Sequence, residues 1–136
     1  MTAEKYIAQV KKLDVIILNK YKERKRWEEI ADSLGGFSVS DRVQTTKNPH
    51  RGTDAVDEYL DIDREIEVLK QERQAIINTI QRLPFIEYDI LYKLFVEEKE
   101  YTLKEIAYEY SKSYEWAKAR KKKALKHLQQ IIDKKG

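Results

Sequence analysis

The 136-residue chain contains no cysteine, which excludes disulfide bonds and cysteine-ligated zinc. Its two histidines, His50 and His127, are far apart in the sequence, so no metal site is expected. No run of about 18 apolar residues occurs and no signal segment opens the chain, which predicts a soluble cytoplasmic protein with no membrane contact. With only 4 Gly and 2 Pro and almost no strand-like alternation, the sequence predicts an all-α fold.

Motifs typical of enzymes are also missing. The chain has no P-loop, no glycine-rich phosphate motif and no plausible Ser/His/Asp arrangement. We therefore expect no catalytic activity, no catalytic residues and no cofactor.

Two long amphipathic helices are predicted before residue 84, separated by a linker at residues 35–53. Apolar residues recur every three or four positions along residues 2–34 and again from about residue 53 to 83. Gly35-Gly36 predicts the end of the first helix, because glycine accepts the left-handed conformation there. The stripes are Tyr6, Val10, Leu13, Ile17, Tyr21, Trp27, Ala31 and Leu34 in the first helix, and Tyr59, Ile62, Ile66, Leu69, Ile76, Ile80 and Leu83 in the second.

The second stripe has the spacing of a coiled-coil seam, interrupted only at Arg73. It can pair with the first stripe as an antiparallel hairpin, or with another chain in a homodimer. Both arrangements bury the same face, so the sequence leaves both open. In either case, residues 1–83 are expected to form a helical hairpin or coiled-coil scaffold. The linker is unusually long for a compact domain, which favours either a mobile connection or a functional arm.

Residues 84–136 have the pattern of a three-helix, helix-turn-helix module. Pro84 disfavours helical geometry at Leu83 and should end the second long helix there, and a third helix is predicted over residues 84–97. Thr102 and Glu105 have capping-box spacing and should open a fourth helix. Ser113 should cap a fifth, reaching about residue 133. Two capped helices joined by a short turn are typical of a DNA-reading helix-turn-helix.

Positive charge is concentrated in the last predicted helix. Residues 113–136 contain eight Lys/Arg against two acids, a local charge of +6 in a chain whose net charge is +3. Such a helix suits the phosphate backbone of double-stranded DNA. A lysine-rich run is otherwise most often a solvated surface helix, but the preceding turn and helix favour the DNA interpretation.

The exposed face of this last helix is the predicted DNA contact surface. Glu115 is placed to accept a hydrogen bond from cytosine N4, and Ala119 to touch a thymine methyl group. Tyr114 and Lys118 should reach phosphates or base edges. Phosphate contacts are expected from the helix start at Ser113 and from Lys121, Lys122, Lys123 and Lys126.

Each of these residues also has a simpler structural explanation. Glu115 suits the positive end of a helix dipole whether or not DNA is bound. Trp116 is expected in the core rather than stacked on a base, and Arg120 is expected to extend along that core.

The C-terminal motifs resemble region 4 of sigma-70-type factors, which binds the -35 promoter element. The resemblance rests on Leu83-Pro84, Glu105-Ile106-Ala107 and Ala124-Leu125-Lys126-His127-Leu128, and covers about a third of the chain. It implies a DNA-reading last helix that includes Glu115, and contact with RNA polymerase. Nothing resembles the -10-binding part of a sigma factor, so a self-sufficient sigma factor is not expected.

The whole chain resembles phage late transcriptional regulators of the RinA and ArpU type. The similarity includes Arg42-Val43-Gln44-Thr45-Thr46 in the linker and the helical segment 59–66. It implies a phage or prophage protein of a low-GC Gram-positive host, which controls late genes in the bacterial cytoplasm and is nucleoid-associated when bound.

Two other functions stay open at this point. A small terminase subunit also joins a DNA-binding helical module to an oligomerising coiled coil. A protein that binds only other proteins, through the seam, would show no salt-dependent affinity for any duplex.

Overall fold

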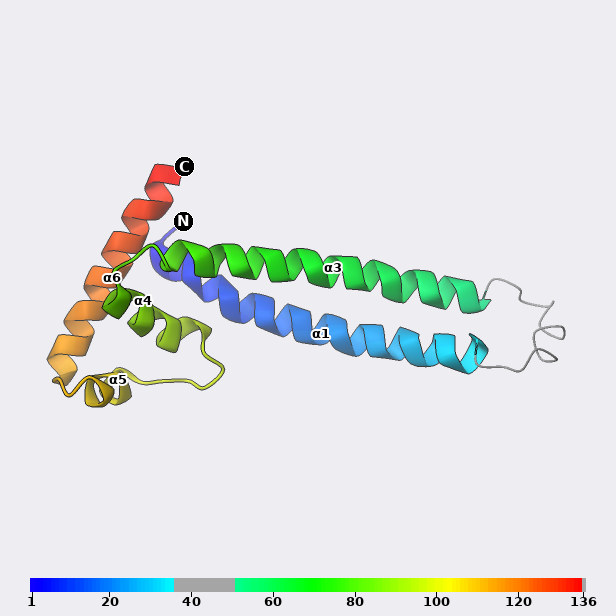
Figure 1. The fold of residues 1–136 in the computed structure, drawn as a ribbon, viewed down its shortest axis with the longest axis horizontal. Helices are drawn as coiled ribbons and strands as arrows, with labels where there is room; N and C mark the ends of the chain where they lie inside the picture. Colours follow the sequence, from blue (N-terminus) through cyan, green and yellow to red (C-terminus); the bar gives the residue numbers. More distant parts are fainter. Residues whose placement is uncertain (36–50, 136) are drawn as a thin grey trace. The chain divides into compact units, whose positions relative to one another are not determined.

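The computed structural model describes residues 1–35 and 51–135, and every regular element in these ranges is helical (Figure 1). The elements are α1 (Ala3–Gly35), α3 (Arg51–Ile80), α4 (Phe85–Leu91), the π-helical turn η2 (Tyr92–Val96), α5 (Leu103–Glu109) and α6 (Tyr114–Lys135). The predicted all-α fold is confirmed. Most of the linker predicted at 35–53 lies outside the described residues. Its last three positions belong to α3, which begins slightly earlier than expected.

The chain divides into two compact units, and both long helices contribute to each. Unit 1 is Met1–Leu13 with Glu72–Gly136, and unit 2 is Asp14–Gln71. The division expected from the sequence, 1–83 against 84–136, follows different limits, because the first turns of α1 and the last turns of α3 belong to unit 1. The division into a scaffold at 1–83 and a DNA-binding module at 84–136 remains a prediction.

Unit 2 is an antiparallel helical hairpin, as expected from the two stripes. The Lys20 ammonium lies 2.7 Å from the Glu65 carboxylate, which sets the register of α1 against α3. Ile62 and Ile66 of the predicted seam are buried. Tyr21, also predicted for the seam, is 41% exposed and lies instead at its edge, where the Lys70 ammonium is 5.2 Å from its ring centroid.

Unit 1 is organised around α6, against which both α4 and α5 pack. The ends of the long helices complete its core. The backbone N–H of Ala3 donates to Oε1 of Gln129 on α6 at 2.6 Å, and the Tyr6 hydroxyl donates to Thr79 at 3.0 Å. The largest fully buried side chains of the unit are Ile7, Val10, Thr79, Ile80, Ile90, Leu91, Ile106 and Leu128.

The helix ends around Pro84 differ from the sequence prediction. α3 stops at Ile80 rather than Leu83, because the chain tightens into a turn in which the Leu83 N–H donates to the Ile80 carbonyl at 3.0 Å. Pro84, with an extended ψ of 147°, is the N-cap of α4. The third helix, predicted over 84–97, is therefore α4 followed by η2. Across η2 the Glu97 N–H donates to the Tyr92 carbonyl at 2.9 Å, a bond that spans five residues.

Candidate nucleic-acid interface

The two helices of the predicted helix-turn-helix begin at side-chain caps, as their sequences indicate. At α5, the Glu105 N–H donates to the Thr102 hydroxyl and the Thr102 N–H donates to the Glu105 carboxylate, both at 3.2 Å. The backbone hydrogen bond to Thr102, together with Lys99, lowers the pKa of the Glu105 carboxyl. At α6, the Trp116 N–H donates to Oγ of Ser113 at 3.1 Å. The predicted capping box and the predicted Ser113 cap are confirmed.

The turn between α5 and α6 depends on a residue with positive φ. Ser111 has φ 55°, in the left-handed region that disfavours residues with a Cβ atom. Its N–H donates to the Tyr108 carbonyl at 3.0 Å, and the next N–H, of Lys112, donates to the Ala107 carbonyl at 2.8 Å. These bonds close the end of α5, so that α6 starts in a new direction only a few residues later.

A polar cluster joins α4 and η2 to the end of α5. The Lys93 ammonium lies 3.1 Å from the Asp89 carboxylate and 2.6 Å from that of Glu109. Burial lowers the pKa of Lys93, but the hydrogen bonds and charges of Glu109 and Asp89 raise it by more than burial lowers it. The net shift of the Lys93 pKa is therefore upward. The Tyr110 hydroxyl donates to Asp89, and burial together with this carboxylate raises the pKa of Tyr110 to about 12. Lys93 stays charged and Tyr110 stays neutral throughout the physiological range.

A buried carboxylate connects α4 to α6. Nδ1 of His127 lies 2.8 Å from each carboxylate oxygen of Glu87, whose side chain is only 3% exposed. A carboxylate is costly to bury without a hydrogen-bonding partner. The pair therefore favours one position of α6 along α4 and joins the middle part of α6 to α4.

One face of α6 is buried in the core of unit 1. Ala117, Ala124 and Leu128 are fully buried. The two alanines are small enough for neighbouring helices to approach closely. The Trp116 ring lies half-buried, 5.4 Å from the Tyr110 ring, and the Arg120 guanidinium lies 5.8 Å from the Trp116 centroid. This agrees with the expectation that Trp116 packs into the core rather than stacking on a base, and that Arg120 extends along that core.

The structure places nearly all of the predicted DNA-contact residues on the other face of α6, exposed to solvent. Tyr114 is 41% exposed, and Lys121 alone in the set is half-buried. The remaining exposed members are Ser113, Glu115, Lys118, Ala119, Lys122, Lys123 and Lys126. Ser113 already uses its hydroxyl as the cap. The exposed side chains of this set lie on α6 or, for Ser113, directly before it.

Two further exposed residues, on α5 of the helix-turn-helix, were not predicted from the sequence. Tyr108, near the end of α5, is 85% exposed, and Lys104 lies one helical turn before it, also exposed. Their i, i+4 spacing on the polar side of a short helix was the available signal. Glu87 was missed as well, because nothing local distinguishes it from an ordinary exposed acid near a helix start.

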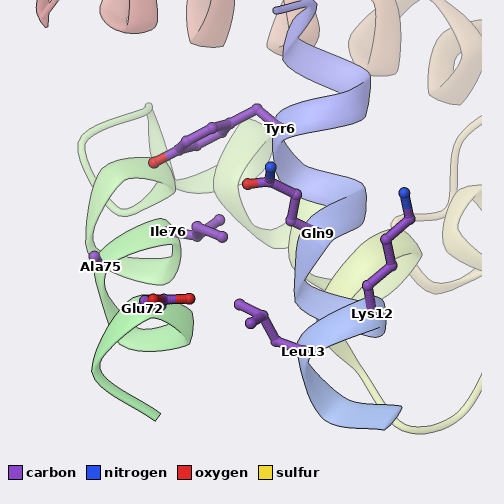
Figure 2. A pocket seen from close by; sticks show the side chains of 7 residues that line it. All are labelled: Tyr6, Gln9, Lys12, Leu13, Glu72, Ala75 and Ile76. Carbon is purple, nitrogen blue, oxygen red and sulfur yellow. The ribbon is translucent and has the colours of Figure 1, made fainter. Parts of the chain in front are cut away.

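A hollow elsewhere in unit 1 has a different character. It has a volume of about 420 Å³, and Figure 2 shows Tyr6, Gln9 and Leu13 of α1 on one side and Ile76 and Glu72 of α3 on the other. No group of three or more His, Cys, Asp or Glu in the described ranges is arranged to hold a metal. None of the helices described is long and apolar enough to cross a bilayer.

Comparison with known proteins agrees with this geometry. Residues 79–130, from the last two residues of α3 through most of α6, match the family model of Sigma-70, region 4. That family is a DNA-binding, non-enzymatic helix-turn-helix domain. No match to the chain was found among curated proteins or solved structures. The match covers less than half of the chain, and it supports a sigma-region-4-like helix-turn-helix in unit 1.

Proposed function

We propose that this protein is a sequence-specific transcription regulator that reads the major groove of double-stranded DNA with α6. The observation that carries the proposal is the division of α6 into two faces. Ala117, Ala124 and Leu128 are buried, while Glu115 and Lys118 near the helix start are exposed. In helix-turn-helix proteins, the first residues of the second helix contact base edges.

The exposed face combines side chains that read bases with side chains that bind phosphate. Glu115 accepts from cytosine N4, and Ala119 contacts a thymine methyl group. Tyr114 and Lys118 reach bases or phosphates. The remaining contacts are made to phosphate groups. Such contacts orient the protein on the duplex without reading its sequence. They come from Ser113, Lys121, Lys122, Lys123 and Lys126.

The biological setting follows from the resemblance to phage late regulators. The protein controls late genes of a phage or prophage, in the cytoplasm of a bacterial host, and contacts RNA polymerase when bound upstream of a promoter. It acts as a homodimer through the helical hairpin. A dimer would place two copies of α6 on two half-sites, which explains why a DNA reader carries a long helical scaffold.

The test is selection of bound fragments from host and phage genomic DNA at physiological salt, followed by sequencing. We expect enrichment of one or a few sites upstream of a late operon, and loss of that enrichment in a Glu115→Ala, Lys118→Gln variant. Lys5→Gln, an exposed charge removed at the start of α1, is the control and should leave the enrichment intact. Enrichment at a packaging site would favour the small terminase function, and uniform weak recovery would favour a protein that binds only other proteins.

A further inference from the structure

The polar side of α5 carries two hydrogen-bond donors that no described part of the chain uses. Tyr108 is 85% exposed, and Lys104, one helical turn earlier, is exposed as well. Within the described residues, neither the Lys104 ammonium nor the Tyr108 hydroxyl takes part in a hydrogen bond or an ion pair. The ammonium has three protons to donate and the hydroxyl has one. Both are therefore available to an acceptor outside the chain.

These two side chains lie on the side of α5 that faces away from the core of unit 1. Ile106 is fully buried, and Lys104 and Tyr108 each stand two positions from it along the helix. Two positions correspond to about 200° of rotation in an α-helix, so both side chains project to the opposite side. Their own separation of four residues places them on the same edge. We call Lys104 and Tyr108 the free edge of α5.

Both acids of α5 are already paired with lysines of unit 1. The Glu105 carboxylate lies 3.3 Å from the Lys99 ammonium. The Glu109 carboxylate lies 2.6 Å from the Lys93 ammonium. Since these carboxylates already have cationic partners, their repulsion of an approaching anion is reduced. The free edge adds a positive charge that has no such partner, so α5 favours an anion there.

The surroundings of Tyr108 are polar rather than apolar. Lys104 and Glu105 lie one turn before it, and Ser111 and Lys112 follow it in the turn toward α6. Protein-binding patches are usually centred on clusters of apolar and aromatic side chains. A single aromatic ring with an unused hydroxyl among charged neighbours suits an anionic, hydrogen-bonding partner better than an apolar one.

The place of α5 in the helix-turn-helix indicates which anion this is. Only residues 110–113 separate α5 from α6, and the two helices pack against each other (Figure 1). When the second helix of such a motif lies in the major groove, the first helix crosses the sugar-phosphate backbone. Lysine and tyrosine side chains both donate hydrogen bonds to phosphate oxygens in protein–DNA complexes.

We propose that the free edge of α5 binds the phosphate strand that borders the bases read by α6. The Lys104 ammonium neutralises one phosphate, and the Tyr108 hydroxyl donates a hydrogen bond to a phosphate oxygen of the same strand. Contacts from two helices hold the strand at two places, which fixes the tilt of α6 in the major groove. This inference rests on the proposed function and adds contact residues from a second helix.

The test is the affinity of the full-length chain for its selected duplex, measured over a range of salt concentrations. Lys104→Gln should flatten the slope of log affinity against log salt by about 0.9, because one phosphate is no longer neutralised. Tyr108→Phe removes only a neutral hydroxyl, so affinity should fall about fivefold while the slope stays unchanged. Each variant should lose the same factor on every sequence, because phosphate contacts carry no sequence information.

The controls are residues of the same types on unit 2. Lys25→Gln and Tyr21→Phe also change exposed side chains, and they should alter neither the affinity nor the slope. Helical circular dichroism should be the same in all four variants and the wild type, so that a loss of affinity reports a lost contact rather than unfolding.

Neutral methylphosphonate groups, placed one at a time along the duplex, locate the contact. At one phosphate, neutralisation should weaken binding of the wild type but have no further effect on Lys104→Gln, because both changes remove the same interaction. If every position that weakens the wild type weakens Lys104→Gln by the same factor, Lys104 contacts no phosphate and the proposal is overturned.

The same measurements separate this proposal from the proposed function. A selective wild type whose affinity and slope are unchanged in Lys104→Gln and Tyr108→Phe would overturn the contact and leave the proposed function standing. A wild type that binds all duplexes equally, with a flattened slope in Lys104→Gln, would remove sequence-specific regulation and leave the contact standing. A wild type that binds no duplex would overturn both.

Discussion

The two compact units are both helical, but they differ in net charge and in how their helices enclose a core. Unit 1 carries 17 Lys/Arg against 11 Asp/Glu, a net charge of +6, whereas unit 2 carries 10 against 13, a net charge of -3. Unit 1 encloses its core with helices in several directions and presents its positive charge on α6. Unit 2 has one seam and leaves an apolar flank exposed. The positive charge of unit 1 suits the DNA binding proposed for α6.

The largest expected effect is the loss of a buried apolar side chain from unit 1, compared with an exposed one in unit 2. Leu128→Ala removes a fully buried side chain from α6 and should lower the free energy of unfolding by about 3 kcal/mol, because the surrounding helices close the cavity only in part. Leu18→Ala in unit 2, where the side chain is 55% exposed, should change it by less than about 0.5 kcal/mol. Urea denaturation measures both, and similar losses would contradict the difference in burial between Leu128 and Leu18.

The Glu87–His127 pair gives the next largest expected effect. His127→Ala leaves the Glu87 carboxylate buried without its hydrogen-bonding partner and should cost about 2–3 kcal/mol of unfolding free energy at neutral pH. His127→Gln, which keeps a donor at this position, should recover part of the loss. A His127→Ala variant as stable as wild type would show that the pair does not hold α6 on α4.

On the DNA-reading surface, Glu115→Ala should relax specificity at one base pair. The expected loss of discrimination is about 1–3 kcal/mol, because a single base-edge contact disappears while the phosphate contacts remain. Competition binding with all four base pairs at each position of the selected site measures it. A loss equal at all sequences would mean that Glu115 only supports the start of α6.

Removing lysines from the same surface should weaken binding to every sequence alike. Lys118→Gln with Lys122→Gln should reduce affinity about tenfold and flatten the slope of log affinity against log salt by about 0.9 for each phosphate that the variant no longer neutralises. Lys25→Gln, an exposed charge on unit 2, is the control and should alter neither quantity. An unchanged slope in the double variant would remove this part of α6 from the interface.

The smallest expected effect concerns the turn before α6. Ser111→Gly should stabilise the protein by up to about 1 kcal/mol, because glycine adopts φ 55° without a Cβ clash. Thermal unfolding measures the change, and Ser111→Ala provides the comparison at the same position with the Cβ retained. A destabilised glycine variant would show that the Ser111 side chain contributes more than its backbone conformation costs.

Local signals in the sequence predicted local structure well. Thr102, Glu105 and Ser113 act within one helical turn, and their cap hydrogen bonds form as predicted. The apolar periodicity predicted the hairpin and the two faces of α6 for a similar reason, since each depends on the spacing of residues along one helix. The end of α3 was less predictable, because Ile80 and Leu83 both continue the apolar period and the turn between them depends on how Leu83 is buried.

What the sequence by itself determined is therefore the all-α fold, the caps, the stripes and the gathering of positive charge on the last helix. Tertiary structure alone decided which side chains meet across helices. Glu87 and His127 are 40 residues apart, and no local pattern marks either one for the other. The same holds for the hollow between α1 and α3, because Val68 and Ile16 border it together only once the register of the hairpin is set. Helical periodicity acts over a few residues, whereas these contacts depend on the packing of whole helices.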